Sequence, residues 1–161
     1  MMMKSIAAIA AFLGLATGAA GADLSSVVVE DGAGARIVLA DLVDGPTILH
    51  FWATWCGPCR KELPELESFA QGIDAERLVL VSVDTVDFAV VEAFLDELGV
   101  GLTGYRQVEG NVGSAFAILG YPSTVVVDGA GEVLFRRQGA IAWEDAGEAG
   151  EVMAFIEAAR R

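Results

Sequence analysis

The stretch HFWATWCGPCRKELP, residues 50–64, contains both cysteines of the chain, Cys56 and Cys59. Two thiols separated by Gly57 and Pro58 are compatible with a metal clip, an inert disulfide or an exchange of electrons. A disulfide that closes so short a loop restricts the unfolded chain very little, so stability alone explains the pair poorly. The place of the pair in the expected fold therefore decides among these three roles.

An apolar run precedes the two cysteines, and a helix is expected to begin at them. The run PTILHFWA, residues 46–53, fits a buried central strand, and the helix is expected from Cys56 to about Gln71. Cys56 then lies where free backbone N–H groups and the positive end of the helix dipole favour a thiolate, the reactive form. Cys59 follows one turn later on the same face, and Pro58 suits a first helical turn. This arrangement predicts thiol–disulfide exchange.

The composition argues against a structural metal. A closed zinc site takes about four ligands, whereas this chain has two cysteines and one histidine, His50, which stands inside the apolar run. We therefore expect no resident metal and no cofactor. Transient binding of Cu(I) by the two thiolates stays open, because soft thiolates suit that ion.

The rest of the chain alternates between strand-like and helix-like segments. Two β-rich runs, 25–30 and 36–39, are separated by DGAGA and predict an N-terminal hairpin. The elements expected further along are strands at 77–84, 123–128 and 132–139 and helices at 87–98, 111–119 and 150–161. Such an order indicates one α/β domain with a mixed central sheet flanked by helices.

The N-terminus and the net charge bear on location and partners. Residues 1–22 combine a short basic start, an uncharged run rich in Ala, Leu and Ile, and AGA before Asp23, which is typical of a secretory signal peptide. An uncleaved anchor is the alternative, although the run is short for a membrane span. The expected domain is 23–161. A net charge of −13 argues against nucleic acid as a partner.

These motifs together resemble a known family. FWATWCGPCRKELPEL, residues 51–66, resembles the active-site signature of the thioredoxin superfamily, and FWATWC in an exported chain resembles its TlpA/ResA-like branch. GYPST at 120–124 stands where that family has its cis-proline loop, and VVVDGAGEVLFRRQGA at 125–140 resembles the hairpin that follows it. The likeness covers most of 23–161 and implies a thioredoxin fold with an extra N-terminal β-hairpin. The peroxidase pattern P-x-x-x-T-x-x-C does not occur in the chain.

The resemblance implies roles for individual residues. Cys56 would be the attacking cysteine and Cys59 the resolving one, linked as a redox-active disulfide. The Tyr121–Pro122 bond would be cis and would place the Tyr121 backbone beside Cys56, where it pairs with an extended client segment. Trp52 is expected in the core. The residues implied to bind the client protein are Trp55, Gly57, Pro58, Tyr121 and Pro122.

The chain departs from the family pattern in its acidic residues. Thioredoxins carry a buried aspartate six residues before the first cysteine, whereas this chain has His50 there. A neutral imidazole can accept the proton of the resolving thiol, or it can be a packed core residue, and both interpretations remain open. Asp84 is the tentative second acid, although Asp87 competes with it and a helix-start role explains either. Relatives dedicated to cytochrome c maturation often have an acid after the cis-proline, where this chain has Ser123.

We therefore expect an exported, periplasmic thiol–disulfide oxidoreductase that reduces disulfides in partner proteins. The Gly-Pro pair favours reduction, because thioredoxin has a potential of roughly −270 mV against about −120 mV for the oxidant DsbA. The expected partners are a membrane-bound dithiol electron donor and clients such as apocytochrome c or copper-site proteins. The alternatives are a disulfide oxidase or isomerase and a copper metallochaperone. We expect a monomer.

Overall fold

The computed structural model describes residues 22–74 and 77–161, so almost all of the expected signal peptide lies outside the described residues. Within them, the strands are β1 (Val28–Glu30), β2 (Arg36–Val38), β3 (Thr47–Trp52), β4 (Leu78–Ser82), β5 (Gly104–Glu109), β6 (Ser123–Val127) and β7 (Val133–Gln138). The helices are α1 (Gly57–Ala70), α2 (Phe88–Leu98), α3 (Val112–Phe116) and α4 (Ala146–Ala159), with 3₁₀ turns at Leu24–Ser26 and Leu39–Leu42. In these two stretches no helix has both the length and the apolar character to cross a bilayer.

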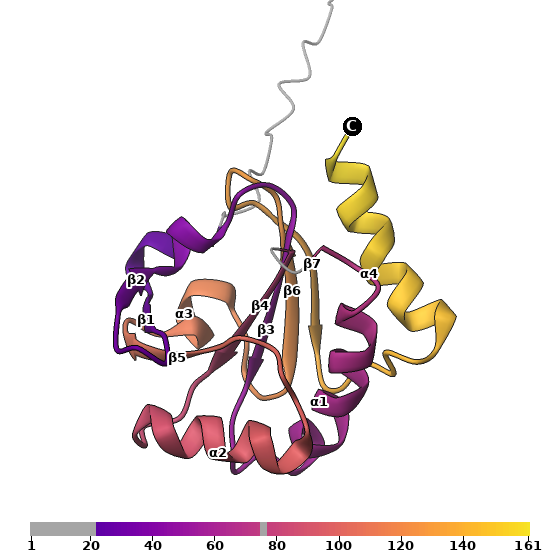
Figure 1. Cartoon of the computed structure of the whole chain (residues 1–161). Coiled ribbons are helices and arrows are strands. Elements are labelled where there is room, and N and C mark those ends of the chain that lie inside the picture. The colour runs from indigo at the N-terminus through magenta and orange to yellow at the C-terminus, as the bar shows by residue number, and fades with distance from the viewer. Residues whose placement is uncertain (1–21, 75–76) are drawn as a thin grey trace, which may run out of the picture.

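The strands form one mixed sheet in the order β2-β1-β5-β4-β3-β6-β7, through the centre of the domain (Figure 1). β3 pairs in parallel with β4, and β4 with β5, whereas β6, β7, β1 and β2 join antiparallel. All six residues of β3 are buried, which is why its sequence is apolar with almost no alternation. The predicted mixed sheet, its flanking helices and the N-terminal β1–β2 hairpin are confirmed.

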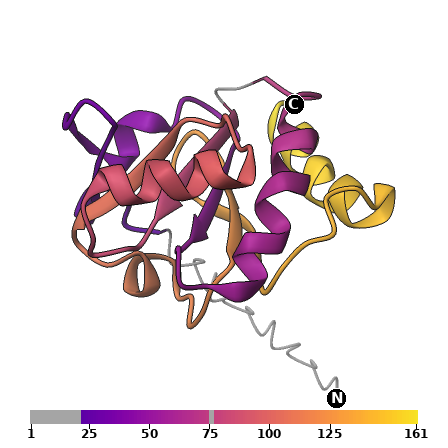
Figure 2. The same cartoon turned by 60° about the horizontal axis from the view of Figure 1, so that its bottom comes forward.

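Two apolar layers enclose the sheet. Helices α1, α2 and α4 cover one face, and Figure 2 shows α1 between the other two. The short α3 and the two 3₁₀ turns cover the opposite face. Ile48 and Trp52 of β3 pack on the first layer, and Leu49 and Phe51 pack on the second. Because side chains alternate along a strand, His50 points toward the layer that contains α1.

One strand, β5, was not predicted from the sequence. β5, Gly104–Glu109, lies between β1 and β4, yet only Gly104 is buried and the other five residues are half-buried or exposed. Its polar sequence YRQVE lacks the apolar run that identified β3 and β4. A strand near the sheet edge keeps its place through backbone pairing, which hydropathy does not report.

Some element ends also differ from expectation. Residues Leu24–Ser26 form a 3₁₀ turn, so the first strand begins only at Val28. Helix α3 ends at Phe116, where Ala117 takes a left-handed backbone conformation, before the expected stop at Gly120. Helix α4 begins at Ala146, because the Asp145 side chain accepts hydrogen bonds from the next backbone N–H groups. Gly99, with φ of 70°, ends α2 as expected.

Candidate active site

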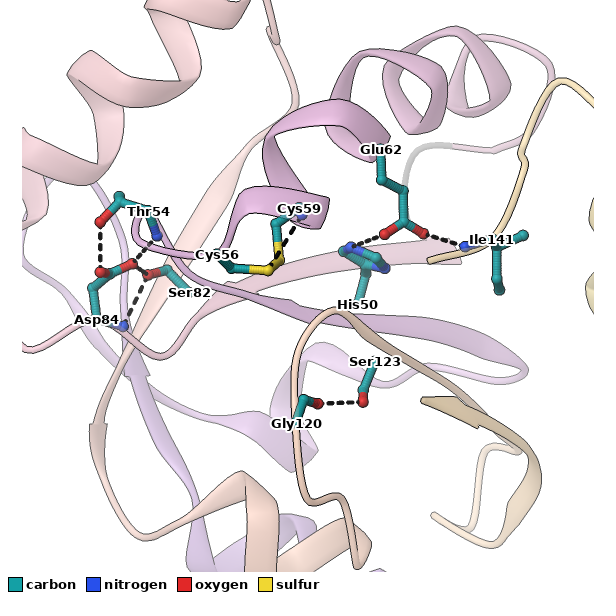
Figure 3. The surroundings of a disulfide bond; sticks show 10 residues. All are labelled: His50, Thr54, Cys56, Cys59, Glu62, Ser82, Asp84, Gly120, Ser123 and Ile141. Atoms are coloured by element: carbon teal, nitrogen blue, oxygen red, sulfur yellow. Dashed lines mark hydrogen bonds and ion pairs between the residues drawn. A yellow bond between two sulfur atoms is a disulfide. The ribbon is translucent and has the colours of Figure 1, made fainter. Parts of the chain in front are cut away.

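The two cysteines form a disulfide at the start of α1. Cys56 is the N-terminal cap of this helix, and its Sγ accepts a hydrogen bond from the Cys59 backbone N–H at 3.2 Å (Figure 3). Pro58 occupies the first turn, which contains no acidic residue to offset the positive end of the helix. The expected position of the pair, after a central strand and at a helix N-terminus, is confirmed.

The surroundings of the two sulfurs differ in exposure. Cys56 retains 5 % of its accessible surface, whereas Cys59 retains none. Trp55 is 68 % exposed and makes an edge-to-face contact with Tyr121, their ring centroids 6.0 Å apart. The Tyr121–Pro122 bond is cis, as expected. Cys56 thus keeps a small accessible surface and is next in the chain to the exposed Trp55, while Cys59 is fully buried.

Trp52 and Asp84 support the site from the inside. Trp52 is fully buried in the same apolar layer as both cysteines and stacks on Phe94, which confirms the core interpretation. Asp84 is also buried, and its two carboxylate oxygens accept hydrogen bonds from the Thr54 N–H, the Thr54 hydroxyl and the Ser82 hydroxyl at 2.6–2.8 Å. These contacts hold the residue that begins the turn toward Cys56. The expected catalytic role of Asp84 stays a prediction.

His50 is enclosed by polar partners from two other elements. Its Nδ1 lies 3.0 Å from the Thr124 hydroxyl on the neighbouring strand β6. Its Nε2 lies 3.8 Å from Oε2 of Glu62 on α1, the pair joined by a dashed line in Figure 3. The side chain is fully buried, and this burial lowers its pKa to about 3. The imidazole is therefore neutral at physiological pH.

Glu62 is a buried acid that lies one helical turn after Cys59. One of its carboxyl oxygens, Oε1, accepts hydrogen bonds from the Ile141 N–H at 2.9 Å and the Trp143 indole N–H at 2.8 Å. Burial raises the pKa of Glu62 to about 7 despite these two donors. Among the described residues, neither its Oε2 nor His50 Nε2 has a hydrogen-bond partner. This carboxyl group can therefore gain or lose a proton near neutral pH.

The comparisons with known proteins agree with this geometry. The AhpC/TSA family matches residues 20–136, which is most of the chain. The chain belongs to this family. It is 39 % identical over 129 residues to the thiol:disulfide interchange protein HelX of Rhodobacter capsulatus, covering 76 % of this chain and 70 % of HelX. It is 29 % identical over 126 residues to the thiol-disulfide oxidoreductase ResA of Bacillus subtilis, covering 78 % and 70 %. The crystal structure of StoA from Bacillus subtilis superimposes with a TM-score of 0.61 at 26 % identity, covering 80 % of this chain and 97 % of StoA.

This AhpC/TSA-family chain is thus a thiol–disulfide oxidoreductase with the thioredoxin fold, of the ResA-like kind that the sequence motifs indicated. The Cys56–Cys59 disulfide and the cis bond at Tyr121–Pro122 are present as the family resemblance implied.

The sequence analysis missed Glu62, Thr124 and Trp143. A signal for Glu62 was present, because it stands three residues after Cys59 and next to Leu63 on the buried stripe of α1. A charged residue on an apolar helix face is the kind of exception that marks a site. Thr124 and Trp143 had no comparable signal, since only the folded sheet and the loop before α4 bring them to His50 and Glu62.

Proposed function

We propose that this protein reduces disulfides in partner proteins, with Cys56 as the attacking nucleophile and Cys59 as the resolving thiol. The observation that carries this proposal is the unequal exposure of Cys56 and Cys59, 5 % against none, at the N-terminus of α1. Cys56, the more exposed of the two, is also the N-terminal cap of α1, where a thiolate is favoured. Cys59 is fully buried and bonded to Cys56, so Cys56 is the sulfur that it would attack.

The proposed reaction exchanges two electrons and two protons. The Cys56 thiolate attacks one sulfur of the client disulfide, that S–S bond breaks, and the released client thiolate takes up a proton. Cys59 then loses its proton and attacks the Cys56 sulfur, which breaks the mixed disulfide and forms the Cys56–Cys59 disulfide, and the second client thiolate takes up a proton as it is released. A dithiol donor must reduce this disulfide before the next cycle, and we propose that the donor is membrane-bound.

We assign the Cys59 proton to Glu62. Glu62 lies on the same buried face of α1, one turn after Cys59, and its pKa of about 7 matches the pH at which a general base works best. His50, for which the sequence left open a role as proton acceptor or as a packed core residue, is a weaker base because burial lowers its pKa to about 3. We therefore assign the proton to Glu62 and place His50 beside it, with Nε2 facing Oε2 of Glu62.

The proposed client site lies around the exposed edge of the disulfide. Trp55, Gly57 and Pro58 are exposed there, and the half-buried Tyr121 contacts the Trp55 ring. With the cis-Pro122 loop, these residues would bind an extended client segment. We propose that the protein is exported to the periplasm and that its clients are apocytochrome c or copper-site proteins, whose cysteines must be reduced before they bind haem or metal.

The direction of electron flow is tested by the reduction potential of the Cys56–Cys59 pair, measured in graded thiol–disulfide buffers. A value more negative than roughly −230 mV supports a reductase. A value near −120 to −180 mV would make the protein an oxidase or isomerase.

The exchange reaction itself is tested by trapping. A Cys59→Ser variant should accumulate mixed disulfides through Cys56, because the resolving step is lost, and a Cys56→Ser variant serves as the matched control and should accumulate far fewer. If neither variant traps client proteins, the two thiols do not exchange, and a copper-binding role would be favoured. The described residues contain no cluster of three or more metal-ligating side chains, so such a role would depend on the two thiolates alone.

A further inference from the structure

The pair His50 and Glu62 has an unusual pattern of filled and unfilled hydrogen-bonding positions. Glu62 Oε1 already accepts from two N–H donors, whereas Oε2 faces His50 Nε2 at 3.8 Å. Both facing atoms are buried and without another partner among the described residues. Their separation is about 1 Å longer than a hydrogen bond, a gap that a small side-chain movement closes.

A hydrogen bond between these two atoms can be made in two ways. If Glu62 is protonated, its Oε2–H donates to an unprotonated Nε2, and the ring carries its hydrogen on Nδ1. If Glu62 is ionised, Nε2–H donates to Oε2, and Nδ1 carries none. A neutral imidazole provides both arrangements without gaining charge.

The Thr124 hydroxyl makes both arrangements complete. It lies 3.0 Å from Nδ1, and a hydroxyl can accept from Nδ1–H or rotate and donate to a bare Nδ1. The residues Thr124, His50 and Glu62 therefore form a chain in which each member can reverse its donor and acceptor roles. Few other side chains at position 50 offer this, because the aliphatic and phenylalanine side chains have neither a donor nor an acceptor.

We propose that His50 is a positioning residue that keeps the Glu62 carboxyl group hydrogen-bonded in both of its protonation states by exchanging its own tautomer. The proposal deepens the function proposed above and rests on it for its use in catalysis, since Glu62 must both take and return a proton in each cycle. In this proposal His50 does not accept the Cys59 proton; its imidazole stays neutral and changes only which ring nitrogen carries the hydrogen.

The charges around Glu62 are compatible with a proton that enters and leaves on the other side. A groove of about 300 Å³ adjoins Glu62 and is lined by Lys61 and Glu65 of the same helix, by Glu148 of α4, and by Pro58 and the 140–142 loop. Glu65 raises the pKa of Glu62, and burial, the larger cause, acts in the same direction. His50 on β3 is the titratable group that faces Glu62 from the sheet. The groove thus borders Glu62 on one side, and the fully buried imidazole of His50 borders it on the other.

The test reads the two ring nitrogens of His50 directly. His50 is the single histidine of the chain, so ¹⁵N NMR of the protein as isolated, without a histidine tag, reports this ring alone. In a neutral ring the nitrogen with hydrogen and the nitrogen without it differ widely in shift, and in an imidazolium the two become similar. We expect hydrogen on Nδ1 below about pH 6 and on Nε2 above about pH 8, with a midpoint near the Glu62 pKa of about 7.

Two variants connect this midpoint to the proposed partners. Glu62→Gln should hold the ring with hydrogen on Nδ1 at every pH, because its amide oxygen must face the two N–H donors and its NH₂ then donates to Nε2. Thr124→Val should lower the midpoint, since a buried N–H without an acceptor is worse than a lone pair without a donor, while Thr124→Ser should restore it.

Three results would overturn the proposal: one tautomer from pH 5 to 9, a ring protonated on both nitrogens, or a tautomer change that persists in Glu62→Gln. None of these readouts uses turnover. A failure of the trapping experiment above would therefore leave the tautomer result standing, and a fixed tautomer would leave the exchange reaction standing.

Discussion

Two buried carboxyl groups flank the disulfide, and they differ in how their oxygens are used (Figure 3). Asp84 has donors on both oxygens, from Thr54 and Ser82. Glu62 has two donors on one oxygen, and its other oxygen faces His50 without a hydrogen bond. Both side chains are 2 % exposed, so burial does not distinguish them. The unfilled position does: Oε2 of Glu62 has no donor among the described residues, whereas both oxygens of Asp84 accept hydrogen bonds that hold Thr54 and Ser82.

The largest expected effect on stability comes from removing the Asp84 carboxylate. Asp84→Ala should lower the free energy of unfolding by about 3–4 kcal/mol, because the Thr54 N–H, the Thr54 hydroxyl and the Ser82 hydroxyl all lose their acceptor. Urea unfolding followed by tryptophan fluorescence measures this loss as a lower midpoint at unchanged slope.

Asp84→Asn is the matched control. Its amide oxygen can replace Oδ2, and its NH₂ can donate to the Thr54 hydroxyl, so we expect a loss below about 1 kcal/mol and retained turnover. If Asp84→Asn is stable but inactive, the reaction needs the negative charge of Asp84 or a proton that it carries. The distinction between a proton-exchanging Glu62 and a structural Asp84 would then be wrong.

The next effect is a dependence of the free energy of unfolding on pH, caused by the titration of Glu62. In the folded protein burial raises the pKa of Glu62 to about 7, from an ordinary value of 4.5, so the folded state binds this proton more tightly than the unfolded chain does. Stability contributed by this group is therefore lost as the pH rises from about 4.5 to about 7. Glu62→Gln keeps an acceptor for Ile141 and Trp143 but does not ionise. Its stability relative to the natural chain should increase by about 3 kcal/mol across that range.

Urea unfolding of both proteins between pH 4.5 and 8 measures this difference. Because His50 is present in both chains, the difference isolates Glu62. A constant gap across the series would mean that Glu62 does not change its protonation state there, and its assignment as acceptor of the Cys59 proton would fail.

The same contrast explains what the sequence could predict. Contiguous motifs were sufficient for three features: the apolar run before Cys56 predicted β3, the C-x-x-C motif at a helix start predicted the position of the cysteine pair, and the GYPST motif, through its resemblance to the thioredoxin superfamily, implied the cis bond at Pro122. Each of these depends on neighbours within a few residues, which a single sequence displays.

Long-range polar contacts were beyond the sequence. The family resemblance pointed to Asp84, at the end of the strand after the cysteine motif, but its partner Thr54 is 30 residues away, and only the parallel pairing of β3 with β4 brings them together. Glu62 passed as one more charged helix residue, since its donors lie 79 and 81 residues further along. Hydropathy identifies which face of an element is buried, but it does not identify which polar atoms meet there.

The smallest effect on stability is expected at Trp55, an exposed residue that precedes Cys56 in the chain and contacts neither Glu62 nor Asp84 by a hydrogen bond. Trp55→Ala should cost less than about 1 kcal/mol, because the ring is 68 % exposed and its aromatic contact is the edge of Tyr121. The rate of reduction of a disulfide-bonded protein client should nevertheless fall by about tenfold, equivalent to about 1.4 kcal/mol of lost docking energy.

Reaction with dithiothreitol separates docking from chemistry, because so small a dithiol does not need the aromatic surface. Its rate should be unchanged in Trp55→Ala and should depend on the two sulfurs and the Glu62 proton alone. Trp55→Phe retains an aromatic ring and should recover most of the rate with the protein client. An equal fall with both reductions would show that Trp55 acts on the reactivity of Cys56, so that the exposed surface and the buried acids could no longer be treated as separate parts of the site.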